Sequence, residues 1–253
     1  MEENRHRFIS GVHNYCDRWC ERCPLTDYCS VYAIEKEMAP VDVEDPEQRE
    51  QFWESISNML KISGELVQEK AEELGVDLDE ISLQADHEKG ERILEELQND
   101  PLSQEIRAYL NDSDAWLDRH RPETEEHREK LVSFESYDRA ESDLDADQRS
   151  IGDLLEVIHW YTPMIYAKTE RALWGINEEL FEEEESVQND HNGSAKVALI
   201  GVDRLMGAWT GMLIYFRNYE DEVLNLLIRL EKIKKGILTH FPDAPKFKRP
   251  GFD

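Results

Sequence analysis

The sequence predicts an all-α protein, a multi-helix bundle with an N-terminal four-cysteine segment that binds a metal or a cluster. Three observations lead to this prediction. Long stretches rich in Glu, Leu, Lys, Arg and Ala repeat apolar residues at intervals of three and four, the period of a helix. Strand patterns and the dipeptides that close β-hairpins are scarce. All four cysteines fall within fourteen residues of each other near the N-terminus.

Helix boundaries follow from residues that start and stop helices. Asp45-Pro46 predicts a helix start, because aspartate caps a helix and proline is favoured at its first position. Gly75 predicts the end of that helix. Asn99-Asp100-Pro101 and Arg121-Pro122 each predict a break with a new helix after it. The predicted helices cover residues 45–75, a stretch through 93–97 that ends at 99, 101–121, 123 to about 140, about 147–181, about 193–218 and about 220–238.

The late helices and the tail suggest how the chain packs. The helices at about 147–181 and 193–218 are the most apolar, so we expect them to form the core. The basic segment 240–253 contains three prolines and three phenylalanines and is expected to lie against the bundle as a strap. We divide the chain into a four-cysteine segment with a flanking helix, residues 1–40, and a helical bundle, residues 41–253, packed as one unit.

The charge balance excludes some partners. Asp and Glu total 57 against 29 Lys and Arg, which gives a formal charge of -28. Such a chain repels phosphate backbones and anionic headgroups, so we expect neither nucleic acid nor membrane as a partner. A protein partner or a small ligand stays compatible with the composition.

Neither the N-terminal residues nor the most apolar segment of the chain requires a membrane. The residues from Met1 to Arg5 begin no apolar signal region, so we expect the protein in the cytoplasm. The segment 197–216 has the length of a membrane span, but Asp203 and Arg204 lie near its centre. A core helix of a bundle explains the same composition.

The cysteine cluster is the sharpest functional signal. Thiolates are soft ligands that suit zinc, copper(I) and iron–sulfur clusters, and four of them complete a tetrahedral ion or a cubane. Two structural disulfides would need an oxidising compartment, which this sequence does not predict. A redox dithiol at Cys20 and Cys23 is an alternative, although a bound centre accounts for all four cysteines. The predicted metal ligands are Cys16, Cys20, Cys23 and Cys29.

The spacing favours an iron–sulfur cluster over zinc. Common zinc sites pair two Cx2-4C turns across a longer gap, whereas Cx3Cx2Cx5C has its one Cx2C turn at Cys20 to Cys23 and no second pair across a longer gap. Cluster-binding loops pack cysteines closely, and Cys23-Pro24 is similar to the Cys-Pro junction of bacterial ferredoxins. We therefore predict an iron–sulfur cluster, with 4Fe-4S preferred, and keep zinc as the alternative cofactor.

Three of the cysteines also resemble another cluster motif. Cys16, Cys20 and Cys23 follow the Cx3Cx2C signature of radical SAM enzymes. That resemblance implies an open iron for S-adenosylmethionine on a barrel of strands and helices. Here Cys29 supplies a fourth ligand and no alternating strands and helices follow, so we do not predict S-adenosylmethionine chemistry.

Glu156 and His159 form an ExxH step, the spacing that brings a carboxylate and an imidazole to one helix face in ferritin-like di-iron proteins. No second ExxH occurs in the sequence, so half of the ligands of such a site would be missing. Both residues lie opposite the apolar arc of their helix at 100° per residue. We therefore expect a solvated helix face.

Polar residues also fall on the apolar helices. Lys168 lies inside the apolar arc of its helix, where a lysine needs a partner or an escape to solvent. On the next helix Asp203 lies beside Arg204 and seven residues after Lys196. We expect Asp203 to pair with Lys168 or Lys196 in a buried ion pair that fixes helix register, or these residues to line a small-molecule pocket. The candidate residues are Lys168, Lys196, Asp203 and Arg204.

The sequence thus predicts a cytoplasmic helical metalloprotein that carries an iron–sulfur cluster for electron transfer, for sensing or as an accessory protein. The alternative is a non-enzymatic binding or scaffold protein with a structural zinc at the same cysteines. The chain contains no Gly-rich phosphate loop, no Ser-His-Asp elbow and no HExxH motif, so the chemistry of hydrolases and nucleotide-dependent enzymes is not indicated. Whether the protein is an enzyme is not decided by these residues.

Overall fold

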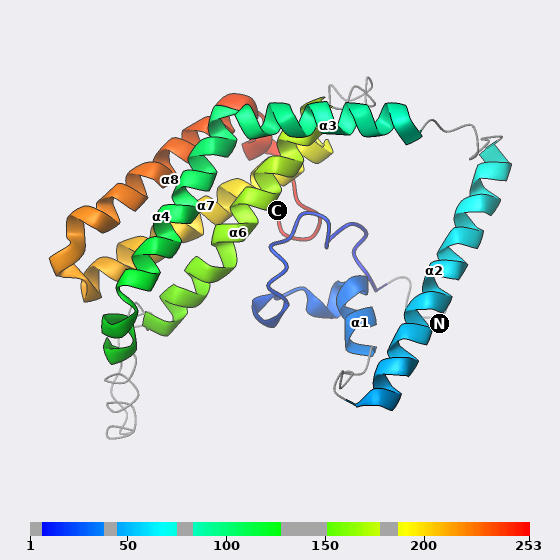
Figure 1. Cartoon of the computed structure of the whole chain (residues 1–253), viewed down its shortest axis with the longest axis horizontal. Coiled ribbons are helices and arrows are strands. Elements are labelled where there is room, and N and C mark those ends of the chain that lie inside the picture. The colour runs from blue at the N-terminus through cyan, green and yellow to red at the C-terminus, as the bar shows by residue number, and fades with distance from the viewer. Residues whose placement is uncertain (1–6, 38–44, 75–82, 128–150, 178–186) are drawn as a thin grey trace. The chain divides into compact units, whose positions relative to one another are not determined.

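Helices make up the regular structure of the described residues, which are 7–37, 45–74, 83–127, 151–177 and 187–253 of this computed structural model (Figure 1). No strand occurs in those ranges. The all-α prediction is therefore confirmed.

The chain forms two compact units. The first comprises Met1–Phe8 and Pro24–Arg92, and the second comprises Ile9–Cys23 and Ile93–Asp253. The limits of these units fall inside the cysteine segment, and the functional division near residue 40 stays a prediction. Three of the four cysteines therefore belong to the second unit, and Cys29 belongs to the first.

The first unit begins its regular structure with a 3-10 turn, η2 (Thr26–Tyr28), followed by α1 (Ser30–Glu37) and α2 (Pro46–Leu74). The bounds of α2 confirm the predicted helix at 45–75. Three large apolar side chains on α2 are exposed and recur every seven residues, so they share one helix face. They are Trp53, Leu60 and Val67.

A single residue separates α3 (Leu83–Asn99) from α4 (Pro101–Arg119). That residue, Asp100, caps α4, because its Oδ1 accepts the backbone N–H of Leu102 at 2.8 Å and that of Ser103 at 3.2 Å. The predicted break at this point is confirmed. The chain is helical again over 121–127, and the rest of the helix expected to reach about 140 lies outside the described residues.

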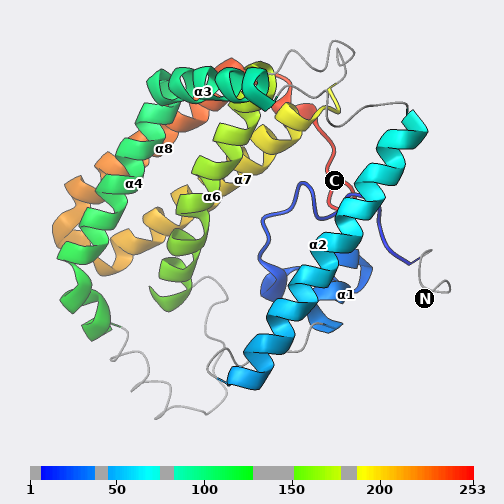
Figure 2. The ribbon, with the colours of Figure 1, turned by 45° about the vertical axis from the view of Figure 1, so that its right-hand side comes forward.

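The second unit is a helical bundle. In it α4 lies beside α6 (Ile151–Asn177), α7 (Asp190–Tyr215) and α8 (Glu220–His240), as Figures 1 and 2 show. α7 packs against α6 and α8, and α4 packs against the same two helices. Each of the three late helices therefore occurs where the sequence predicts it, within a few residues at the described ends.

The core lies between these helices, and glycines let α6 and α7 approach closely. A Cβ at Gly201 would lie 2.8 Å from the side chains of Met164 and Ile165, and one at Gly211 would lie 2.8 Å from Leu154. Gly201 and Gly211 of α7 therefore serve close helix packing, the commoner of the two uses that the sequence suggests. Side chains with no exposed surface at this interface include Ile158, Ile165, Leu205 and Trp209.

α7 is also the one helix of the described residues that is long and apolar enough to cross a membrane by length and composition. Its most apolar window has a mean hydropathy of 1.4, and half of that window is buried inside the protein. Core helices of soluble proteins meet the same criterion.

The C-terminal segment lies against the bundle. Phe241, Ala244 and Phe247 are buried, and the 3-10 turn η4 (Ala244–Lys246) contacts α7. Lys196 of α7 donates a hydrogen bond from Nζ to the carbonyl oxygen of Pro245 at 2.7 Å. This packing confirms the prediction that the C-terminal segment lies against the bundle.

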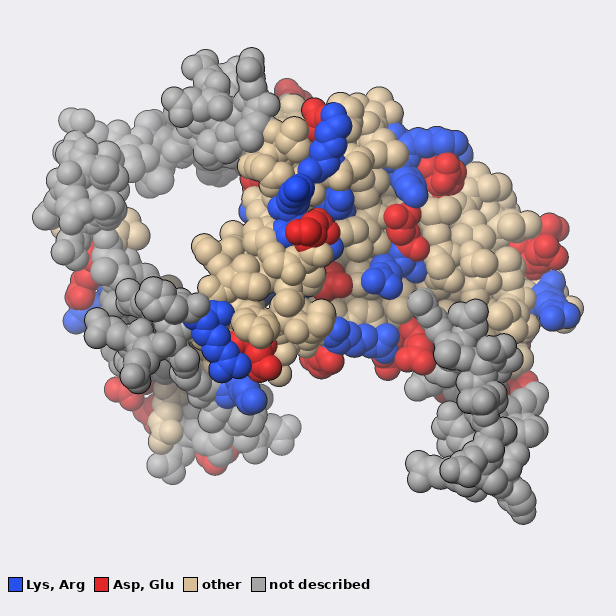
Figure 3. Space-filling model, turned by 180° about the vertical axis from the view of Figure 1, so that it is seen from behind, with Lys and Arg blue, Asp and Glu red and all other residues tan. Residues whose placement is uncertain are grey.

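The surface charge is mixed where it is visible. On the face shown in Figure 3, lysine and arginine side chains lie next to aspartate and glutamate side chains. Neither sign forms a continuous patch on the described residues of that face. On the described residues of this face, acidic side chains are therefore interspersed with basic ones.

A buried tyrosine makes the bundle sensitive to alkaline pH. Tyr109 has no exposed surface and accepts a hydrogen bond from Trp209 Nε1 at 2.8 Å. Burial raises the pKa of Tyr109 to about 12. The pKa of Tyr109 is higher in the folded protein than in the unfolded chain, so the stabilisation from the neutral, buried tyrosine is fully present below pH ~10. As pH rises from ~10 to ~12, this contribution to the free energy of unfolding, about 3 kcal/mol, is lost.

We expect Tyr109→Phe to flatten this alkaline decrease in the free energy of unfolding, measured by urea titration between pH ~8 and ~12. At neutral pH the variant should be less stable by about 1–3 kcal/mol, because the Trp209 N–H loses its acceptor. The exposed Tyr28 provides the control as Tyr28→Phe, which should retain the wild-type pH profile. An unchanged alkaline limb in Tyr109→Phe would contradict the assignment.

Candidate metal centre

The second unit carries a segment that we call the cysteine strap, residues 9–23, which lies against the bundle and the C-terminal segment (Figure 1). It includes Cys16, Cys20 and Cys23. All four cysteines of the chain are free thiols and are partly buried. Partly buried free thiols are accessible to an incoming metal ion and need no reduction before they bind it.

Short turns set the backbone at each cysteine. Cys16 Sγ donates to the carbonyl oxygen of His13 at 3.4 Å. The 3-10 turn η1 (Cys20–Arg22) is closed by a hydrogen bond from the Cys23 N–H to the Cys20 carbonyl at 3.2 Å. In the first unit, the backbone N–H of Tyr32 donates to Cys29 Sγ at 3.5 Å. The backbone at these cysteines is therefore held by local turns.

The strap is anchored first through Tyr15. Its hydroxyl donates to Asp190 Oδ1 at 3.1 Å, and Arg171 holds the same carboxylate with two hydrogen bonds of 2.9 and 2.7 Å. The Tyr15 ring meets Phe247 edge to face, with centroids 4.7 Å apart. A Cβ at Gly193 would overlap the Tyr15 ring, so the absence of a side chain there admits the tyrosine.

The second anchor is Asp17. Its Oδ2 accepts the Tyr161 hydroxyl at 2.5 Å, and its carbonyl oxygen accepts Trp160 Nε1 at 2.9 Å. Burial raises the pKa of Tyr161, and the hydrogen bond to the Asp17 carboxylate raises it further. Tyr161 is therefore a neutral donor to Asp17 at physiological pH.

The third anchor combines Trp19 with Arg22. Trp19 stacks on Trp160 with centroids 5.2 Å apart and an interplanar angle of 22°, and the Arg22 guanidinium lies 4.2 Å above the Trp19 ring. Arg22 also pairs with Asp153 at 3.2 Å and with Glu156. A stacked and charge-paired arginine has less conformational freedom than an exposed one, so this end of the strap is well ordered.

Arg18 shows that the backbone between two cysteines is constrained. Its φ of 58° makes it the one described non-glycine residue with a positive φ. Non-glycine residues adopt this left-handed conformation only where their surroundings impose it. Here the neighbours Asp17 and Trp19 are both held by the bundle.

The cysteine strap explains why Lys168 lies on the apolar side of α6. It is half-buried on α6 and donates from Nζ to the Asn14 carbonyl oxygen at 3.5 Å. Burial lowers the pKa of Lys168, and the nearby Arg171 lowers it further. Burial also raises the pKa of Cys16, while Arg18 and Lys168 act against this increase. The apolar surroundings that the sequence predicts for Lys168 are thus covered by the cysteine strap.

The predicted ion pair of Asp203 does not form as expected. Asp203 is exposed and pairs with Lys234 of α8 at 2.7 Å, instead of with Lys168 or Lys196. Arg204 is exposed as well. Because Lys168 and Lys196 bond to backbone carbonyls of the two terminal segments, neither reaches Asp203. The structure does not bring the four candidate residues together into one pocket.

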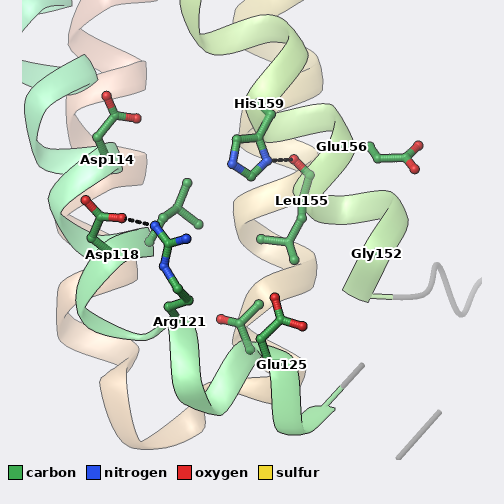
Figure 4. A pocket seen from close by; sticks show the side chains of 10 residues that line it. Asp114, Asp118, Arg121, Glu125, Gly152, Leu155, Glu156 and His159 are labelled. Atoms are coloured by element: carbon green, nitrogen blue, oxygen red, sulfur yellow. Dashed lines mark hydrogen bonds and ion pairs between the residues drawn. The ribbon is translucent and has the colours of Figure 1, made fainter. Parts of the chain in front are cut away.

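Glu156 and His159 point outward, as expected from the helical wheel. Both line a pocket of about 370 Å³ between the end of α4 and the start of α6 (Figure 4). His159 Nδ1 donates a hydrogen bond to the Leu155 carbonyl at 2.8 Å, because a carbonyl oxygen can only accept. Glu156 points away from the other labelled side chains in Figure 4 and pairs with Arg22 of the strap instead.

Other charged side chains are spread around this pocket. Figure 4 shows Asp114 and Glu125 on separate sides, while Asp118 pairs with Arg121. The pocket walls are thus mixed in charge.

Across the described parts of the chain, no three His, Cys, Asp or Glu side chains converge closely enough to hold a metal ion. The strap is included, so the thiols of Cys16, Cys20 and Cys23 do not lie together as a ligand set.

The sequence analysis missed the anchors of the strap. Each anchor stands next to a cysteine in the sequence, and this pairing of an aromatic or charged residue with a predicted ligand was the available signal. The anchors are Tyr15, Asp17, Trp19 and Arg22.

No protein-family model, curated protein or solved structure matches this chain. Its function therefore has to be inferred from the chemistry of its own residues.

Proposed function

We propose that this chain is a cytoplasmic metalloprotein that binds an iron–sulfur cluster and serves electron transfer, sensing or an accessory role. The observation that carries the proposal is the placement of four free thiols within fourteen residues. Four thiolates supply the complete ligand set of a 4Fe-4S cluster without any other residue. The proposed ligands are Cys16, Cys20, Cys23 and Cys29.

Two features of the strap support a bound centre. The three cysteines of the strap lie on backbone that the bundle braces, and binding of a centre would draw their thiols together. Arg18 and Lys168 act electrostatically on Cys16, and Arg22 stands in the turn between Cys20 and Cys23. A centre with four thiolates is anionic, and Arg18 and Lys168 beside Cys16 would offset part of its charge. Cys29 joins the set by its spacing in the sequence.

Zinc at the same four cysteines is the second candidate. The tight η1 turn between Cys20 and Cys23 supports it, because a Cx2C turn is common to many zinc sites. In this case the centre would hold the strap in place, and the protein would act as a binding or scaffold protein.

Anaerobic purification followed by measurement of iron, sulfide and zinc per chain tests the proposal. A brown protein with about four irons and four sulfides per chain is the expected result. A colourless protein with about one zinc per chain would favour the second candidate. A protein with neither metal, which also fails to take up either one after anaerobic reconstitution, would contradict both.

A further inference from the structure

The 3-10 turn η1 brings one pair of cysteines together. Cys20 begins this turn, and the Cys23 N–H closes it with a hydrogen bond to the Cys20 carbonyl oxygen at 3.2 Å. A 3-10 helix has three residues per turn and rises about 2.0 Å per residue, so residues i and i+3 lie one above the other with Cα atoms about 6 Å apart. The Cα atoms of disulfide-bonded cysteines are usually about 4.4–6.8 Å apart. The turn therefore spaces this pair as a disulfide requires.

Contacts with α6 hold both ends of the turn. Trp19, the residue that precedes η1, stacks on Trp160 of α6. Arg22, the last residue of η1, lies over the Trp19 ring. Arg22 also pairs with Asp153 and Glu156 of α6. Because the turn is braced at both ends, closing a disulfide across it loses little further conformational entropy.

The other two cysteines lack this arrangement. Arg18, with a φ of 58°, lies between Cys16 and Cys20, and a residue in the left-handed conformation interrupts a regular 3-10 turn. Cys29 follows a different turn, η2, and belongs to the first unit. Among the pairs that four cysteines allow, the backbone therefore favours Cys20 with Cys23.

We propose that Cys20 and Cys23 are a reversible redox pair that exchanges with low-molecular-weight disulfides such as oxidised glutathione. Both residues are partly buried thiols, which leaves them accessible to a small disulfide. In a reducing compartment, disulfides of this kind are transient and serve catalysis or redox sensing. The inference requires no metal and so goes beyond the proposed function.

The exchange takes place in two balanced steps. The thiolate of one cysteine attacks a sulfur of the external disulfide, which forms a mixed disulfide and releases one external thiol. The second cysteine then attacks the protein sulfur of that mixed disulfide and releases the other external thiol. The protein dithiol is oxidised by two electrons, the external disulfide is reduced to two thiols, and the two cysteine protons pass to those thiols.

Exchange at this pair and binding of the proposed centre exclude each other. The disulfide consumes two of the four thiols that we propose as ligands. Coordination in turn occupies the thiolates that would otherwise attack a disulfide. Where both proposals hold, the thiol–disulfide balance of the surroundings decides whether the ligand set of the centre is complete.

The experiment uses the full chain, reduced and freed of metal by a chelator, and equilibrates it in mixtures of reduced and oxidised glutathione. Acid stops the exchange, and N-ethylmaleimide alkylates the remaining thiols. Trypsin then cuts between the two cysteines, after Arg22. The expected tryptic peptides are 8–18 with Cys16, 19–22 with Cys20, and 23–36 with Cys23 and Cys29.

We expect peptides 19–22 and 23–36 to become linked by a disulfide as the share of oxidised glutathione rises. Cys16 should stay alkylated throughout. The variant Cys29→Ser should keep the linked product, and Cys23→Ser should lose it, which identifies the partner within peptide 23–36. Circular dichroism should show the same helical signal in the reduced and oxidised chains, because the core of the bundle contains no cysteine.

Comparison with the chain unfolded in concentrated urea tests the part played by the braced turn. The equilibrium constant for forming the disulfide should be about tenfold or more larger in the folded chain, because closure in the unfolded chain must also order the turn. Equal constants in the two states would overturn the role of the turn.

Three other results would overturn the pairing. They are a link from peptide 19–22 to peptide 8–18, a link that Cys29→Ser abolishes, and a chain that stays reduced or forms only mixed disulfides with glutathione in every mixture. Metal is absent throughout this experiment, so its outcome is independent of the metal analysis that tests the proposed function.

Discussion

The double variant Cys20→Ser/Cys23→Ser is expected to lose the proposed metal centre while the helical bundle remains folded. The binding free energy of structural zinc sites is about 10–16 kcal/mol. Removing two of four ligands should therefore lower the affinity for the metal by several orders of magnitude. Serine is nearly isosteric with cysteine but is a poor ligand for zinc and iron. Metal analysis of the purified variant measures the loss.

The control for this prediction lies in the same turn. Glu21→Gln changes an exposed side chain between the two cysteines and should keep the wild-type metal content. Circular dichroism should show the helical signal of the wild type in both variants, because the core of the bundle contains no cysteine. A double variant with undiminished metal content would show that Cys20 and Cys23 are not ligands.

The largest loss of stability is expected for Trp209→Ala. Trp209 has no exposed surface, meets Trp116 edge to face with centroids 5.1 Å apart, and donates its N–H to Tyr109. Replacing a fully buried tryptophan by alanine costs about 3–5 kcal/mol, because the protein relaxes only partly around the cavity. The free energy of unfolding from urea titration should fall by this amount, with a decrease in Tm of about 10 °C or more.

Ile214→Ala serves as the matched control for this substitution. Ile214 lies on the same helix, α7, but is 63% exposed. Its truncation should change the free energy of unfolding by no more than about 0.5 kcal/mol. If both variants lost similar stability, the helix propensity of α7 and not the core contact of Trp209 would account for the effect.

The two sets of candidate site residues differ in how far the sequence could predict them. The cysteines stand close together in the chain, so their spacing alone indicates a shared ligand. Asp203 is different, because the sequence shows that its helix is apolar but not which neighbouring helix faces it. Its partner Lys234 belongs to α8, and its expected partners Lys168 and Lys196 are occupied by the two terminal segments.

By itself the sequence determined the helices of the bundle and the grouping of the four cysteines along the chain. Caps, prolines, glycines and apolar periodicity act within a few residues, as at Asp100 and Pro101, so their effect can be read along the chain. Only the tertiary structure decided that the cysteine strap docks on α6 and α7 beside the C-terminal segment. The contacts that hold it, such as Asp17 with Tyr161 and Tyr15 with Phe247, join distant segments, and their pairing follows from packing and shape complementarity, which no local pattern encodes.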